Sequence, residues 1–277
     1  MTLSLIAAVA GALLYGVASV MQAVAVRRSG GLNALRHPLY LAGLVCDGAA
    51  WVASLLALHA LPLFTVQAIL AGSVAVTVVL ARLVLAAVVR RVDLVAVGVV
   101  VVTLAVLALA AGPDAGGETA ASAGFIATTL VALGVLVAAA ALTYRAGHGI
   151  WFAALAGLAS SGAAVSARAA HLAIPSGAAG VLDIARQPLV WAIVGFGLLT
   201  IVTFARSIER AAVGPVMAIL SVIDVIVPAG IGLAVLGDAV RSGWALAAVA
   251  ATVAAVVASA VLALSPATEA AQGSAAA

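Results

Sequence analysis

The stretch that decides the fold class is residues 92–111, VDLVAVGVVVVTLAVLALAA, in which Asp93 is the single charged residue. A helix needs about 20 predominantly apolar residues to cross the hydrocarbon core of a bilayer, and this run has that length. Its apolar residues are continuous, without the alternation of polar and apolar positions that is typical of a barrel strand. The stretch therefore predicts a transmembrane α-helix.

Further runs of the same kind are separated by charged residues, proline or glycine. They cover residues 3–26, 38–58, 62–89, 122–143, 147–168, 188–205, 213–237 and 240–264. The composition agrees, because 66% of the 277 residues are hydrophobic and 8% are charged, whereas a soluble domain has about 25% charged residues. We therefore predict an all-α integral membrane protein, a polytopic bundle of about nine transmembrane helices that contacts the lipid bilayer.

The same composition excludes several classes of protein. The formal net charge is only +3 and the arginines lie in short loops, so we expect no nucleic-acid partner. The single cysteine, Cys46, excludes an intramolecular disulfide and a multi-cysteine metal site. The chain has no nucleotide-binding loop, metalloprotease helix or nucleophile elbow. We therefore expect neither enzymatic activity nor a bound cofactor.

The distribution of arginine predicts the orientation in the membrane. Alternating spans bring one group of arginines to one face, namely Arg27, Arg28, Arg36, Arg90, Arg91, Arg145, Arg206 and Arg210. The other face receives Arg168, Arg186 and Arg241, together with the acidic loop that contains Asp114 and Glu118. The face richer in arginine is expected to be cytoplasmic. Because the basic residues are all arginine and Ala, Val and Leu abound, the coding bias indicates a GC-rich bacterium. We predict a multi-pass protein of the bacterial inner membrane, with the N-terminus outside and the C-terminus cytoplasmic.

An internal repeat appears when the chain is shifted by 150 residues. Arg36-His37-Pro38-Leu39 then lies over Arg186-Gln187-Pro188-Leu189, and Val66-Gln67-Ala68-Ile69-Leu70 lies over Val216-Met217-Ala218-Ile219-Leu220. Helix boundaries coincide under the same shift, and an odd number of crossings gives the halves opposite orientations. The alternative is a chance match between helices rich in Ala, Val and Leu. Inverted repeats are typical of secondary transporters.

This repeat divides the chain into four parts. We predict a first transmembrane repeat at residues 1–111, and an outer acidic loop with a linking helix at 112–146. A second, inverted transmembrane repeat follows at 147–264, and a disordered cytoplasmic tail at 265–277.

Short motifs at helix ends carry a resemblance to a known family. In the second half, Gly214-Pro215 precedes an apolar helix, which is followed by Gly237-Asp238 and a closing helix. The first half begins similarly at Leu61-Pro62 and then has Arg90-Arg91-Val92-Asp93. With inverted halves, this pattern resembles the drug/metabolite transporter (DMT) superfamily, which implies a membrane transporter. Four helices before a middle one resemble its NIPA-like branch, linked to magnesium transport, more than the ten-helix EamA-like branch. Asp47-Gly48 is the nearest counterpart of the Gly-Glu pair of NIPA-like proteins.

Polar residues inside the predicted spans are the candidate site. Asp47 and Asp224 lie about midway along the second and eighth helices, where an ionisable group costs at least a few kcal/mol and faces the bundle interior. Each can bind a cation or exchange it for a proton, and together they form a metal site if they converge. Alternatively, each accepts hydrogen bonds from a neighbouring helix. Gln22 and Gln67 either ligate a polar substrate or join helices. Trp51 forms a cavity wall and a cation–π face, or faces lipid.

From these residues we predict a secondary transporter that moves a small polar or cationic metabolite or drug by alternating access. One alternative is a magnesium or other divalent-cation permease. Another is a non-transporting membrane scaffold or accessory subunit in envelope assembly. A transporter is expected to line a polar cavity with Asp47 and Asp224, whereas a scaffold can pack them together in a dry core. A homodimer is one assembly open to such a chain.

Overall fold

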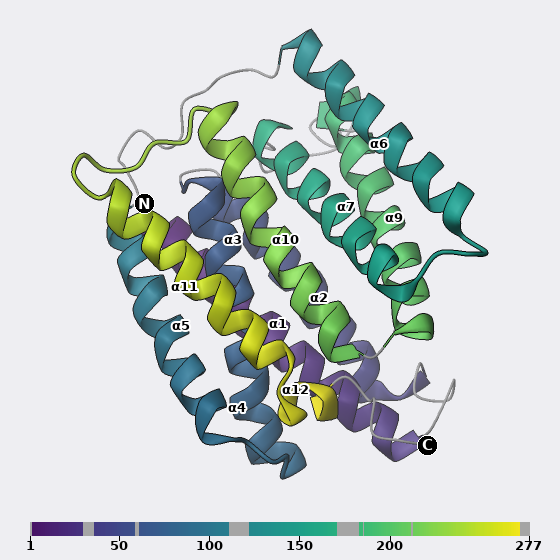
Figure 1. Cartoon of the computed structure of the whole chain (residues 1–277), viewed down its shortest axis with the longest axis vertical. Coiled ribbons are helices and arrows are strands. Elements are labelled where there is room, and N and C mark those ends of the chain that lie inside the picture. The colour runs from purple at the N-terminus through teal and green to yellow at the C-terminus, as the bar shows by residue number, and fades with distance from the viewer. Residues whose placement is uncertain are drawn as a thin grey trace.

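The computed structural model describes residues 2–29, 36–58, 61–110, 122–170, 183–184, 186–211 and 213–271, and all structural statements concern these ranges. The helices are α1 (Thr2–Ser29), α2 (Pro38–Leu58), α3 (Leu63–Ala71), α4 (Ser73–Leu85), α5 (Arg91–Ala110), α6 (Ala123–Thr143), α7 (Gly149–Ala170), α9 (Pro188–Arg210), α10 (Val213–Ala234), α11 (Ala245–Ala263) and α12 (Pro266–Ala271). Together they form the bundle in Figure 1. The acidic loop with Asp114 and Glu118 lies outside the described residues.

The surface of this bundle is apolar along its helices. Within the described ranges, nine spans are long and apolar enough to cross a membrane, with α3 and α4 counting as one span at Leu63–Leu85. Large aliphatic side chains point outward, for example Leu142 at 86% exposure and Leu246 at 82%. Water would disfavour such a surface, whereas the hydrocarbon core of a bilayer accommodates it. The prediction of an all-α polytopic membrane bundle is therefore confirmed.

The two halves of the chain pack in the same way. In the first half α1 contacts α2, α3 and α4, and in the second half α7 contacts α9 and α10. The halves meet where α10 contacts α3 and where α5 contacts α11. Figure 1 shows α1 and α7 running in opposite directions and α6 at the periphery, against α7 and α9. Pro38 and Pro188, 150 positions apart, begin α2 and α9, as suits a residue without an N–H group.

Small residues make this close packing possible. Alanine, glycine and serine occupy most of the buried positions of α7. Without a difference in hydrophobicity between helix and lipid, such small side chains allow helices to approach closely and gain dispersion energy. The core between α7 and α9 is completed by Phe152 and Phe196, both at most 2% exposed.

The third span differs from its predicted extent of 62–89. A turn at Gly72 separates α3 from α4, and a Cβ atom there would lie 2.9 Å from the Ile69 carbonyl and from Leu104 of α5. The helix ends at Leu85 because Ala86 adopts the left-handed conformation, with φ of 52°. The Ala87 N–H then donates to the Ala81 carbonyl at 3.2 Å, which satisfies one of the last carbonyls of the helix.

The C-terminal tail also differs from the disordered segment expected from residue 265. Residues 266–271 form α12, which contacts α4. The Thr268 hydroxyl donates to the Leu262 carbonyl at 2.6 Å, and Ala267 is fully buried. Composition alone indicated disorder, but these tertiary contacts order the first turns of the tail.

Candidate functional site

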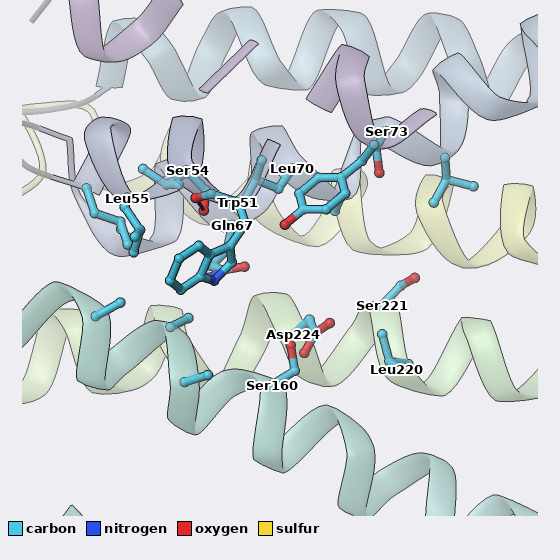
Figure 2. A pocket seen from close by; sticks show the side chains of 18 of the residues that line it. Trp51, Ser54, Leu55, Gln67, Leu70, Ser73, Ser160, Leu220, Ser221 and Asp224 are labelled. Carbon is cyan, nitrogen blue, oxygen red and sulfur yellow. Dashed lines mark hydrogen bonds between the residues drawn. The ribbon is translucent and has the colours of Figure 1, made fainter. Parts of the chain in front are cut away.

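A cavity of about 380 Å³ lies between the two halves of the bundle. Its walls come from α1, α2, α3, α4, α7 and α10, and most of the lining is aliphatic. Figure 2 shows Trp51 and Gln67 reaching into it from one side and Ser160 and Asp224 from the other. The residues with polar atoms in this lining are Tyr15, Trp51, Ser54, Gln67, Ser73, Ser160, Ser221 and Asp224.

The repeat shapes the cavity wall. Several lining residues of α3 and α4 stand 150 positions before lining residues of α10. These pairs are Gln67 and Met217, Leu70 and Leu220, Ala71 and Ser221, and Val74 and Asp224. Corresponding helices of the two halves therefore present corresponding positions to one space. The pairs differ in chemistry, and only the α10 half contributes a carboxylate.

Asp224 is the single charged residue of this lining. Its neighbour across the helix interface is Ser160 of α7, which lies beside it in Figure 2. The carboxylate oxygen Oδ1 is buried and has no hydrogen-bond partner among the described residues. Pro228, inside α10, has no N–H to donate to the Asp224 carbonyl one turn earlier. The side chain and the main chain of this residue therefore both offer acceptor oxygens.

Most of the described acidic residues form ion pairs with arginine, and Asp224 does not. Six acidic side chains are described, and four of them form ion pairs with arginine. The four pairs are Arg90–Asp93 at 3.1 Å, Arg168–Asp238 at 3.0 Å, Arg186–Asp183 at 3.7 Å and Arg206–Glu209 at 2.6 Å. The two described acids that form no ion pair with arginine are Asp47 and Asp224. Both lie midway along membrane-spanning helices. A carboxylate at this depth is costly and marks an ion or substrate pathway by default.

The Arg168–Asp238 pair is buried, with side-chain exposures of 3% and 0%. Asp238 also accepts the Leu63 N–H at 2.6 Å, and Arg168 donates to the Leu58 carbonyl at 2.7 Å. Burial raises the pKa of the Asp238 carboxyl, while the Leu63 N–H and the charge of Arg168 oppose that rise. The pair joins the end of α2, the start of α3, the end of α7 and the segment after α10.

Asp47 has a neutral partner. The Gln22 amide of α1 donates to Asp47 Oδ2 at 2.6 Å. Gly43 permits this contact, because a Cβ atom at that position would lie 2.8 Å from Gln22 Cγ. Neither Asp47 nor Gln22 belongs to the cavity lining. Tyr15, which does line the cavity, lies near both Asp47 and Asp224.

The structure therefore divides the five residues predicted for the site. Asp224, Gln67 and Trp51 line one cavity, whereas Asp47 and Gln22 bind each other beside it. No group of three or more His, Cys, Asp or Glu side chains suited to a metal ion is found in the described ranges. Sequence reasoning missed Tyr15, Ser160 and Pro228. Only Pro228 carried a signal, since a proline four residues after a mid-membrane acid frees that acid's carbonyl.

Comparison of the chain with protein families, with curated proteins and with solved structures finds no match. The geometry of the site is therefore the basis for its functional interpretation. Two features define that geometry: a cavity between corresponding halves, and one carboxylate without an arginine partner on its wall.

Proposed function

We propose that the protein is a secondary transporter that moves a small polar or cationic solute across the bacterial inner membrane. The observation that carries this proposal is Asp224, which lines the central cavity midway along α10 and has no ion pair with arginine in the described part of the chain. Keeping such a carboxylate inside a membrane bundle costs at least a few kcal/mol. That cost is understandable when the carboxylate binds a solute or a proton during the transport cycle.

The arrangement of the halves supports the same proposal. In transporters built from inverted repeats, the substrate site lies near the bilayer midplane between the repeats, and rocking of one repeat against the other opens it to alternate sides. Here α3 and α4 of one half face α10 of the other across the cavity. Asp224 would bind the solute or exchange it for a proton as the cavity changes sides. The resemblance of the helix-end motifs to the DMT superfamily agrees with this function.

The cavity favours a transporter over a scaffold or accessory subunit. A scaffold has no need for an open space of about 380 Å³ at its centre, because close packing would stabilise it. In addition, Asp47 and Asp224 do not pack together in a dry core, since Asp47 is bonded to Gln22 and Asp224 lines the cavity. We infer that the function is transport rather than catalysis, because a central cavity between two inverted halves is typical of secondary transporters.

Flux into proteoliposomes tests this proposal. The purified chain is reconstituted and assayed with divalent cations, polyamines, amino acids, sugars and cationic drugs. We expect flux of at least one solute, and its loss in the Asp224→Asn variant with unchanged folding in a thermal melt. Glu209→Gln is the matched control, because this exposed acid lies outside the cavity. Unchanged flux in Asp224→Asn, or no flux of any solute with folded protein, would overturn the proposal.

A further inference from the structure

The net charge of the cavity wall limits the charge of its ligand. When ionised, Asp224 contributes one negative charge, and none of the described arginines lines the cavity. Inside a bilayer, a charge without a counter-charge is strongly disfavoured. An anion would meet the carboxylate without any basic group to bind it. A ligand with a single positive charge makes the site neutral, whereas a dication leaves one charge uncompensated.

The cavity wall carries too few carboxylates to hold a divalent metal ion. Magnesium and calcium take six or more oxygen ligands and are held by carboxylates. The cavity offers one carboxylate, and the second unpaired acid, Asp47, is bonded to Gln22 outside the lining. The described ranges contain no cluster of three acidic, histidine or cysteine side chains. A dehydrated Mg²⁺ would therefore lack both charge balance and a complete ligand shell.

The remaining wall suits an organic cation. Trp51 extends from α2 into the space opposite Asp224 of α10 (Figure 2), and Tyr15 adds a second aromatic ring to the lining. Aromatic faces attract ammonium groups, most strongly where water is excluded. Most other lining side chains are aliphatic, so alkyl substituents on the nitrogen find apolar contacts.

The size of the cavity agrees with this chemistry. A volume of about 380 Å³ falls near the lower end of the roughly 300–1,000 Å³ of small-molecule pockets. A bare metal ion would leave most of that space empty. A small molecule with a charged nitrogen and several alkyl groups would fill much more of it.

From these four observations we propose that the cavity binds an organic monocation, an alkyl-substituted ammonium whose nitrogen lies between the Asp224 carboxylate and the Trp51 ring. This inference rests on the proposed function, because it names the solute class for the same cavity. It excludes a dehydrated divalent metal as the main ligand and makes the charge of the ligand decisive for binding.

A pair of isosteric probes isolates the charge. Choline and 3,3-dimethylbutan-1-ol have the same shape, and they differ by nitrogen with a positive charge in place of a neutral carbon. Calorimetry on the detergent-purified full chain gives a Kd for each probe. Because the Asp224 charge and the Trp51 ring both favour the cation over its neutral isostere, we expect choline to bind about 10- to 100-fold more tightly. Equal affinities, absence of choline binding, or displacement of choline by equimolar Mg²⁺ would overturn the proposal.

Variants then locate the charge and the ring. In Asp224→Asn the preference for choline over the alcohol should vanish, whereas Glu209→Gln should keep it. Trp51→Leu should weaken choline binding about 3- to 30-fold, and Trp51→Phe should retain most of it, because the cation–π term needs an aromatic face. A preference for choline that survives in Asp224→Asn would contradict the assignment of the charge to this residue.

The repeat offers a relocation of the carboxylate. Val74 is the counterpart of Asp224 and lines the same cavity. The double variant Val74→Asp with Asp224→Val should again prefer choline over the alcohol. The single variant Val74→Asp places two carboxylates on the wall and should shift the preference toward 1,4-diaminobutane, a dication. A folded double variant that binds both probes equally would contradict the inference.

The outcomes separate this inference from the proposed function. If proteoliposomes transport a neutral or divalent solute in an Asp224-dependent way and choline does not bind, the transporter stands and the monocation is wrong. If choline binds but no solute crosses the membrane, the assigned ligand stands and transport is wrong.

Discussion

Asp224 and Asp238 lie on and just after the same helix, α10, and both place carboxylate oxygens inside the protein, yet their surroundings are opposite. Asp238 is paired with Arg168 at 3.0 Å and accepts the Leu63 N–H. Asp224 has Ser160 as a neutral neighbour, and one of its oxygens has no partner in the described ranges. Burial alone therefore does not identify a functional acid. The absence of a counter-charge distinguishes Asp224 from Asp238.

The paired acid has a structural task beside the cavity. Arg168 donates to the Leu58 carbonyl, and the Leu58 side chain lines the cavity. The Arg168–Asp238 pair therefore closes one end of the helix arrangement that leaves the space beside Asp224 open. Removing Arg168, the counter-charge of Asp238, should lower the stability of the fold. Removing the carboxylate of Asp224 should weaken ligand binding.

Breaking the Arg168–Asp238 pair should give the largest loss of unfolding free energy. Arg168→Met leaves Asp238 buried without its counter-charge, which costs about 3–5 kcal/mol of unfolding free energy. Denaturant unfolding in detergent measures this loss. Combining Arg168→Met with Asp238→Leu should recover much of it, since the stranded charge is gone. Arg186→Met is the control, because its pair with Asp183 is exposed and contributes little. A loss as small as that of the control would contradict a structural role for the buried pair.

A smaller disturbance of the same pair comes from a methyl group. A Cβ atom at Gly232 would lie 2.5 Å from Asp238 Oδ2, whereas a Cβ atom at Gly230 meets nothing within 4 Å. Gly232→Ala should destabilise the protein by about 1–3 kcal/mol through overpacking. Gly230→Ala should keep or raise stability, because alanine favours the helix. Thermal melts of the two variants make the comparison, and equal melting temperatures would argue against a tightly fixed Asp238.

The smallest predicted effect concerns a second paired acid. Asp93 is bonded to Arg90 and also accepts the Ser265 hydroxyl at 2.8 Å. Ser265→Ala removes one of several hydrogen bonds to Asp93, since Arg90 remains, and also the bond from the Ala267 N–H to the Ser265 hydroxyl at 3.2 Å. It should cost about 1 kcal/mol. The exposed Ser242→Ala should cost less. A loss above that of Gly232→Ala would show that Asp93 depends on Ser265 more than on its arginine.

The fold was largely predictable because the physics of a membrane span is local. Continuous apolar runs gave the helices, and Pro38 and Pro188 marked corresponding helix starts. The depth of Asp224 within its run also identified it as a candidate. Composition misled for the tail, since the helix at 266–271 depends on contacts with α4.

Partnerships across the bundle were not predictable from one sequence. Arg168 and Asp238 are separated by 70 positions, and Gln22 and Asp47 by 25. Local spacing can indicate the i, i+3 pairs Arg90–Asp93, Asp183–Arg186 and Arg206–Glu209, but it cannot indicate a pair between distant helices. The position of Tyr15 near Asp47 and Asp224 results from helix packing and was not predictable for the same reason.

The functional role of Asp224 and the structural role of Asp238 are compared by Asp224→Asn and Asp238→Asn, the same chemical change at both positions. Thermal melting in detergent gives the stability of each variant, and calorimetry with choline gives its binding. Asp238→Asn should lower the melting temperature, because Arg168 loses its counter-charge. Asp224→Asn should keep or raise the melting temperature and lose choline binding. If Asp224→Asn lowers the melting temperature as much as Asp238→Asn, Asp224 is a structural acid and its proposed role in ligand binding is wrong.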